Sequence, residues 1–134
     1  MNKIQTVMTH FSAPTGRFLL ATIFIMSGLN KIGAYEGTQG YMEAMGVPGG
    51  LLPLVIALEA LGGLAILIGY QAKLAALALA GFSVMSAILF HADFSDQMQM
   101  MSFMKNLTIA GGFLMIVAHG AGAYSLDNRR TAQV

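Results

Sequence analysis

Four long apolar runs dominate this 134-residue sequence and restrict the folds open to it. A helix needs about 20 mainly apolar residues to cross the hydrocarbon core of a bilayer, and each run supplies that length. The runs show no period-two alternation, and the chain is too short for a closed barrel. The sequence therefore predicts an all-α integral membrane protein, a four-helix bundle in one domain covering residues 1–134. The predicted spans are residues 16–35, 51–70, 72–92 and 105–124.

Composition supports a membrane protein and excludes several functions. Charged residues make up 10% of the chain, against about 25% in soluble domains. There is no cysteine, so the chain alone offers no thiolate metal ligand and no cysteine-held iron–sulfur cluster. The net charge of +1 comes without a basic stripe, which argues against a nucleic-acid partner. No nucleophile triad, phosphate-binding loop or metal-binding helix pair appears, so we assign no catalytic residue, no metal and no intrinsic cofactor.

Basic residues concentrate on one side of the predicted topology. The first and third loops between the spans carry acidic residues and no base, apart from lysines at the adjacent helix ends. The positive-inside rule then places both termini in the cytoplasm and these two loops outside. The bases on the cytoplasmic side are Lys3, Arg17, Lys73, Arg129 and Arg130.

Glu59 lies in the middle of the apolar run LPLVIALEALGGLAILIGY, residues 52–70. An acidic side chain near a helix centre costs about 2.5–3.5 kcal/mol on insertion scales. At the helical rise, Glu59 lies about 12 Å below the outer end of its span, and Lys31 lies about 7 Å below the outer end of the first span. A Glu59–Lys31 pair would offset much of the desolvation cost. Gly62 and Gly63 share the helical face of Glu59 and let a neighbouring helix approach it.

Other polar groups share this outer half of the predicted bundle and come from all four spans. They predict a polar pocket open to the outside, because ionisable groups inside a membrane commonly mark a functional site. A salt bridge that only orders the bundle remains the alternative. His91 fits a proton carrier or an interfacial side chain equally well. The candidate pocket residues are Ser27, Asn30, Lys31, Glu59, His91, Lys105 and Asn106.

Four segments together resemble the DoxX family of small four-helix bacterial membrane proteins. They are RFLLATIFIMSGLNKI (residues 17–32), EALGGLAILIGY (59–70), FHADF (90–94) and FMKNLTIAGGFLM (103–115). The stretch GTQGYMEAMGVPG (37–49) is most similar to enterobacterial inner-membrane members of unassigned activity. The resemblance implies a bacterial inner-membrane protein, linked to quinone as the partner of an oxidoreductase. It supplies no catalytic residue set.

We therefore expect a multi-pass inner-membrane protein that binds a quinone or quinol and serves a redox protein partner. Any enzymatic role would be that of the membrane subunit of a quinone-dependent oxidoreductase, since the chain has no electron carrier. One alternative is a protein that binds or transports a lipid or small solute. Alternating access usually needs two repeats, so transport would require a homo-oligomer. A structural assembly factor without chemistry is the other alternative.

Overall fold

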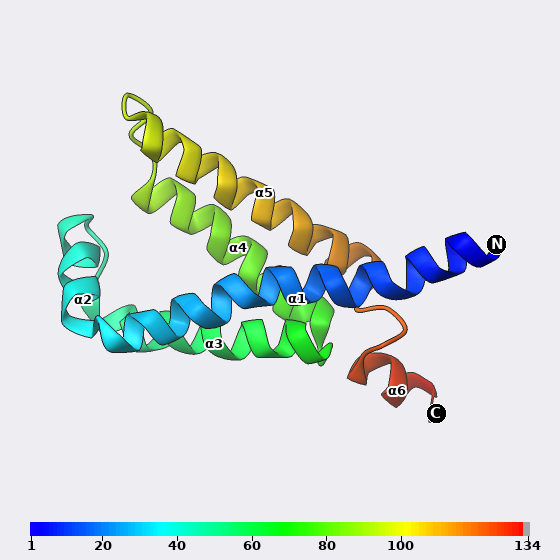
Figure 1. The fold of residues 1–134 in the computed structure, drawn as a ribbon. Helices are drawn as coiled ribbons and strands as arrows, with labels where there is room; N and C mark the ends of the chain where they lie inside the picture. Colours follow the sequence, from blue (N-terminus) through cyan, green and yellow to red (C-terminus); the bar gives the residue numbers. More distant parts are fainter. Residues whose placement is uncertain (133–134) are drawn as a thin grey trace.

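The computed structural model describes residues 1–132, which form helices joined by short connections (Figure 1). Within that range there is no strand, and four helical segments are long and apolar enough to cross a membrane. The predicted all-α, four-helix membrane fold is confirmed. The elements are α1 (Lys3–Gly33), α2 (Tyr35–Ala44), η1 (Gly49–Leu51), α3 (Leu52–Ile68), α4 (Ala72–Phe90), α5 (Gln97–His119) and α6 (Leu126–Ala132).

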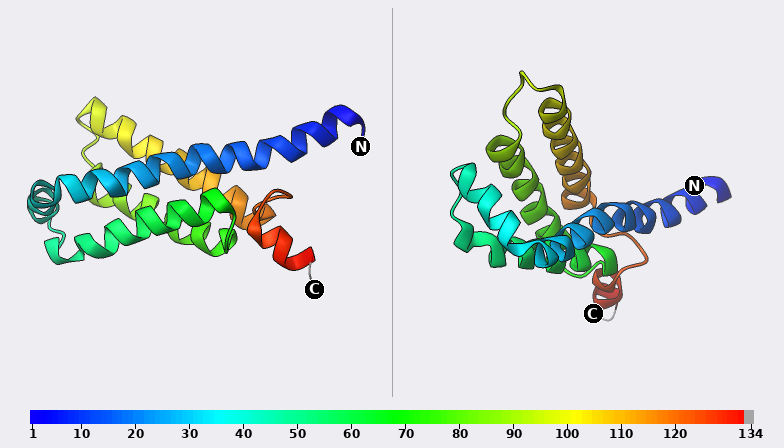
Figure 2. Two further views of the ribbon diagram at one scale, coloured as in Figure 1. Left: turned by 60° about the horizontal axis from the view of Figure 1, so that its bottom comes forward. Right: turned by 60° about the vertical axis from the view of Figure 1, so that its left-hand side comes forward.

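The four long helices form two pairs. Helix α1 packs chiefly on α3, and α4 packs chiefly on α5, whereas contacts between the pairs are fewer. The pairs meet near the α3–α4 turn and diverge toward the end that carries α2 and the α4–α5 connection (Figures 1 and 2). The N-terminus and α6 lie at the opposite end (Figure 1). We call the α2 end the outer end, because the distribution of basic residues predicts that it faces outside.

Two of the long helices begin earlier than the apolar runs. Helix α1 starts at Lys3, where Asn2 and Gln5 form a reciprocal capping box, and continues through Pro14. Helix α5 starts at Gln97, where the Asp96 side chain accepts a hydrogen bond from the Met98 N–H. Capping side chains satisfy the free N–H groups of a first turn wherever it lies, whereas hydropathy marks only the membrane-embedded part.

The segment expected to be a glycine-rich outer loop, residues 36–50, contains a helix. Helix α2 covers Tyr35–Ala44 despite two internal glycines. Tertiary packing outweighs their low helix propensity, because Met42 is buried and Tyr41 stacks on Phe90 of α4 with ring centroids 5.5 Å apart. Gly46 ends the helix at φ +82°, and the Val47 N–H donates to the Met42 carbonyl at 2.8 Å. A structured cover therefore lies over the outer end.

Close packing of α1 against α3 depends on two glycines. A Cβ atom at Gly63 would lie 2.9 Å from Ile25 Cγ1 and 3.3 Å from the Ala21 carbonyl oxygen. A Cβ atom at Gly28 would lie 3.2 Å from Ala60 Cβ. Small residues at such positions let helix backbones approach and gain dispersion contacts where water gives no hydrophobic driving force.

Arg17 ties the inner ends of the helices together. Its side chain is 3% exposed and donates hydrogen bonds to the Ile66 carbonyl at 3.1 Å, the Leu67 carbonyl at 3.0 Å and the Tyr124 carbonyl. Both belong to the last turn of α3, where carbonyls lack the usual helical N–H partner, although the Ile66 carbonyl also accepts the Gly69 N–H at 3.3 Å. From the sequence, Arg17 was identified only as one of the basic residues on the cytoplasmic side.

Asp127 makes the complementary contact at the start of α4. Its carboxylate accepts hydrogen bonds from the backbone N–H groups of Gln71 at 2.7 Å and Ala72 at 2.9 Å. A carboxylate is favoured there because the N-terminus of a helix carries partial positive charge. The segment after α5 is thereby fixed to the α3–α4 turn.

Substitution of Gly63 by alanine should lower the thermal stability of the protein in detergent. The added methyl group must push α1 from α3, and overpacking of this kind costs about 1–3 kcal/mol. Gly111→Ala is the matched control, since a Cβ there meets nothing within 4 Å. Circular dichroism melting of both variants checks the prediction, and equal melting temperatures would contradict it.

Substitution of Arg17 by leucine should destabilise the inner end. The variant loses the hydrogen bonds from the guanidinium to three carbonyls. A hydrogen bond to a charged group contributes about 1.5–3 kcal/mol to stability. Limited proteolysis should cut the segment after residue 120 faster than in the wild type, while the exposed Arg129→Leu control behaves like the wild type. Unchanged cleavage in Arg17→Leu would show that the contact contributes nothing.

Candidate functional site

The predicted ion pair forms between α1 and α3. Lys31 Nζ lies 2.7 Å from Glu59 Oε1. The Glu59 side chain is 2% exposed and the Lys31 side chain is 27% exposed. A carboxylate this deeply buried requires a cation close by, because desolvation of an isolated charge is very costly. The glycine contacts between α1 and α3 bring the two side chains within reach.

Both members of the pair keep unused hydrogen-bonding capacity. An ammonium group has three N–H donors, and Lys31 directs one to Glu59 and one to Ser27 Oγ, also at 2.7 Å. Glu59 Oε2 is buried and accepts no hydrogen bond from any described residue. A buried acceptor without a donor costs about 1–3 kcal/mol. The site thus holds an acceptor without a donor next to an ammonium with one further N–H.

A cavity of about 430 Å³ adjoins this pair and lies between the two helix pairs, with α2 residues also in its wall. That volume falls in the range of small-molecule sites. Most of the wall is apolar, including Phe24, Phe82, Phe90 and Ile109. Its polar side chains are Ser27, Lys31, Thr38, Tyr41, Glu59, Ser83, Ser86, His91 and Asn106.

Five of the seven candidate residues line this one cavity: Ser27, Lys31, Glu59, His91 and Asn106. Asn30 instead lines an adjoining groove on α1. Lys105 is exposed and belongs to neither of these two linings. Successive residues of a helix point about 100° apart, so a neighbour at the correct depth turns to another side.

His91 stands at the C-terminal end of α4, half-buried, in the cavity wall. Its Nδ1 atom lies 3.1 Å from Gln99 Oε1 in the first turn of α5. With that amide oxygen as acceptor, Nδ1 carries the proton and Nε2 is left as an acceptor. His91 therefore provides a proton-accepting group at the outer side of the cavity.

Sequence reasoning missed the contributions of α2 and of the middle of α4. Thr38, Tyr41 and Met42 were assigned to a loop, so no residue of that segment was predicted to line the pocket. Ser83 and Ser86 lie three residues apart on α4, and this spacing could have shown that they share a face. Ser83 donates to the Leu79 carbonyl at 2.8 Å and is satisfied within its own helix.

These features define a small polytopic membrane protein with a mainly apolar cavity and an ion pair at membrane depth. The DoxX family model matches residues 13–92, well over half of the chain. The protein belongs to the DoxX family, and the resemblance noted from its motifs is confirmed.

Two relatives extend this result. The chain is 55% identical over 111 residues to inner membrane protein YqjF of Escherichia coli (strain K12). The aligned residues cover 83% of this chain and 85% of YqjF. It is 32% identical over 120 residues to inner membrane protein YphA of the same organism, covering 84% of this chain and 86% of YphA. No solved structure matches the chain. The protein is a multi-pass inner-membrane protein.

Removal of one partner of the Lys31–Glu59 pair should destabilise the protein more than removal of both. Lys31→Met leaves a buried carboxylate, and breaking a buried pair costs about 3–5 kcal/mol, less here because Lys31 is partly exposed. Lys31→Met with Glu59→Gln should recover much of the loss. Thermal unfolding of the two single variants and the double variant in detergent gives the coupling energy. Additive losses would mean that the two charges do not interact.

Proposed function

We propose that the protein binds a quinone or quinol in the cavity beside Lys31 and Glu59 and serves an oxidoreductase as its membrane subunit or partner. The observation that carries this proposal is Glu59, a lining residue of a ligand-sized cavity whose buried Oε2 has no donor among the described residues.

The pair offers a complementary contact to each redox form. A quinone oxygen can only accept a hydrogen bond, and the remaining N–H of Lys31 can donate one. A quinol hydroxyl can donate, and the Glu59 carboxylate can accept once its side chain turns the buried Oε2 toward the cavity. The apolar wall around Phe82 and Phe90 suits an uncharged ring, as in small-molecule sites generally. Both forms are therefore accommodated without adding net charge to the cavity.

Oxidation of a quinol to a quinone releases two electrons and two protons. Glu59 and His91 are the groups in the cavity wall that accept protons, and His91 lies at the outer side. The electrons must go to a partner protein with its own redox centre, because residues of this chain offer no electron carrier. The reverse direction takes electrons from that partner.

A phospholipid head group is the second candidate for the cavity. Lys31 would attract its phosphate, but Glu59 Oε1 already lies 2.7 Å from the same ammonium. A phosphate would stand next to a buried carboxylate, and like charges in a low-dielectric site repel strongly. An uncharged head group avoids this cost. If the Lys31–Glu59 pair were purely structural, its ion pair would be explained, but the cavity beside it would have no role.

Binding of a ubiquinone analogue should raise the melting temperature of the purified protein, since a ligand at 100 times its Kd stabilises the folded state by about 2.7 kcal/mol. Lys31→Met should weaken binding of the oxidised form most, because it removes the donor. Glu59→Gln should weaken binding of the reduced form most, because it removes the carboxylate acceptor. We expect losses of about tenfold, equivalent to about 1.4 kcal/mol.

Lys105→Met is the matched control, because it removes a lysine outside the cavity wall and should leave both affinities unchanged. Titrations of oxidised and reduced analogue against all four proteins provide the comparison. The absence of any shift in the wild type would refute quinone binding. Equal losses in the Lys105 control would show that the effect is one of general charge.

A further inference from the structure

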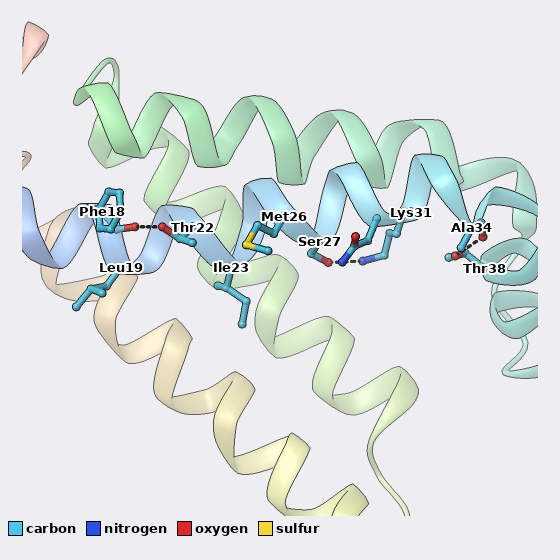
Figure 3. A pocket seen from close by; sticks show the side chains of 10 residues that line it. Phe18, Leu19, Thr22, Ile23, Met26, Ser27, Lys31, Ala34 and Thr38 are labelled. Carbon is cyan, nitrogen blue, oxygen red and sulfur yellow. Dashed lines mark hydrogen bonds between the residues drawn. The ribbon is translucent and has the colours of Figure 1, made fainter.

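A second hollow, of about 610 Å³, runs along α1 to the α1–α2 bend (Figure 3). We call it the α1 groove. In Figure 3 the side chains of Leu19 and Ile23 extend toward the side on which α4 and α5 lie. The groove is lined by Phe18, Leu19, Thr22, Ile23, Met26, Ser27, Asn30, Lys31, Ala34 and Thr38.

The α1 groove adjoins the cavity and shares four lining residues with it. Ile23, Ser27, Lys31 and Thr38 line both, so the ammonium of Lys31 stands where the two spaces join. The part of the groove from Phe18 to Lys31 is roughly 20 Å long at the rise of an α-helix. A molecule with its head group at Lys31 therefore has an open path along α1 toward the inner side.

The groove is less polar than its residue names suggest. The Thr22 hydroxyl donates to the Phe18 carbonyl at 2.7 Å, and the Thr38 hydroxyl donates to the Ala34 carbonyl at 2.8 Å. Both threonines thus satisfy their hydroxyls within their own helices. Ser27 is bonded to Lys31. The unsatisfied polar groups lie at the Lys31 end, and the rest of the groove suits hydrocarbon.

Helices α5 and α2 lie near the two ends of the groove, while its side is open. At the inner end α5 approaches α1, where a Cβ atom at Gly112 would lie 3.3 Å from Leu20 Cδ2. At the outer end Thr38 of α2 belongs to the wall. Between these points α1 and α5 make few contacts and diverge (Figures 1 and 2). The remaining opening faces the acyl chains of the bilayer.

We propose that the α1 groove holds the isoprenoid chain of the quinone, which enters the cavity sideways from the bilayer between α1 and α5. This inference rests on the proposed function and names its substrate class as quinones with one long chain. The α1 groove leads from the Lys31–Glu59 site along a single helix, which suits a single chain. A diacyl phospholipid brings two chains and a phosphate, and Glu59 disfavours the phosphate.

The test compares two ligands with the same quinone head group, one without a chain and one with a long isoprenoid chain. Full-length protein in nanodiscs of one fixed lipid composition binds each ligand. Leu19→Trp and Met26→Trp fill the groove without altering the cavity wall, since neither residue lines the cavity. Both variants should bind the long-chain quinone at least tenfold more weakly and the chainless quinone with unchanged affinity.

Leu61→Trp is the control, because Leu61 is a lipid-exposed leucine of α3 that lines neither hollow. Comparison between variants in one membrane removes the effect of chain length on partitioning. Leu19 lies about 18 Å along α1 from Lys31, so Leu19→Trp should discriminate only against chains long enough to reach it.

Three outcomes would overturn the inference. The groove variants could match the Leu61 control, or they could weaken the chainless ligand equally. In detergent without lipid, added diacyl phospholipid could compete away the long-chain quinone while the chainless quinone still binds. The last result would identify a phospholipid as the occupant of the groove. Failure of the wild type to bind either quinone would instead refute the proposed function.

Discussion

A carboxylate buried at membrane depth is the constraint on which the rest of this structure depends. Glu59 cannot remain charged in hydrocarbon without a cation, so α1 must present Lys31 at the same depth and in contact. That contact is available only because Gly28 and Gly63 let α1 and α3 approach closely. Ser27 then fixes the position of the ammonium. The α1–α3 pair is thus one unit whose polar groups form one side of the cavity.

The four long helices are held together at the inner end of the molecule and separate at the outer end. At the inner end, Arg17 and Asp127 satisfy the free backbone groups at the end of α3 and the start of α4, so charge closes the structure there. At the outer end the helix pairs separate, and α2 covers the space between them through the Tyr41–Phe90 contact. Closure at one end therefore places the open cavity at the other.

Hydropathy and the cost of burying charge predicted much of this from sequence. Helix number, membrane location and the Lys31–Glu59 pair follow from segment length and depth alone. The starts of α1 and α5 did not follow, because caps at Asn2 and Asp96 act outside the apolar runs.

The direction in which a side chain points around its helix was harder to predict than its depth in the membrane. Depth placed Asn30 and Lys105 beside the other polar groups, but Asn30 lines only the α1 groove and Lys105 lines neither hollow, because successive residues point about 100° apart. Helix α2 was missed since its glycines favour a loop until packing is included. The burial of Arg17 was not predicted, because its partners are backbone carbonyls. Every residue has such a carbonyl, so the sequence does not show which ones Arg17 contacts.

The separation of the helices into two pairs has a mechanical consequence. Each pair is held by close internal packing, while fewer contacts join the pairs. The width of the cavity then depends on the angle between the two pairs. Lateral pressure in the bilayer acts directly on that angle. Membrane thickness and lipid composition should therefore affect the width of the cavity, even through lipids that never touch it.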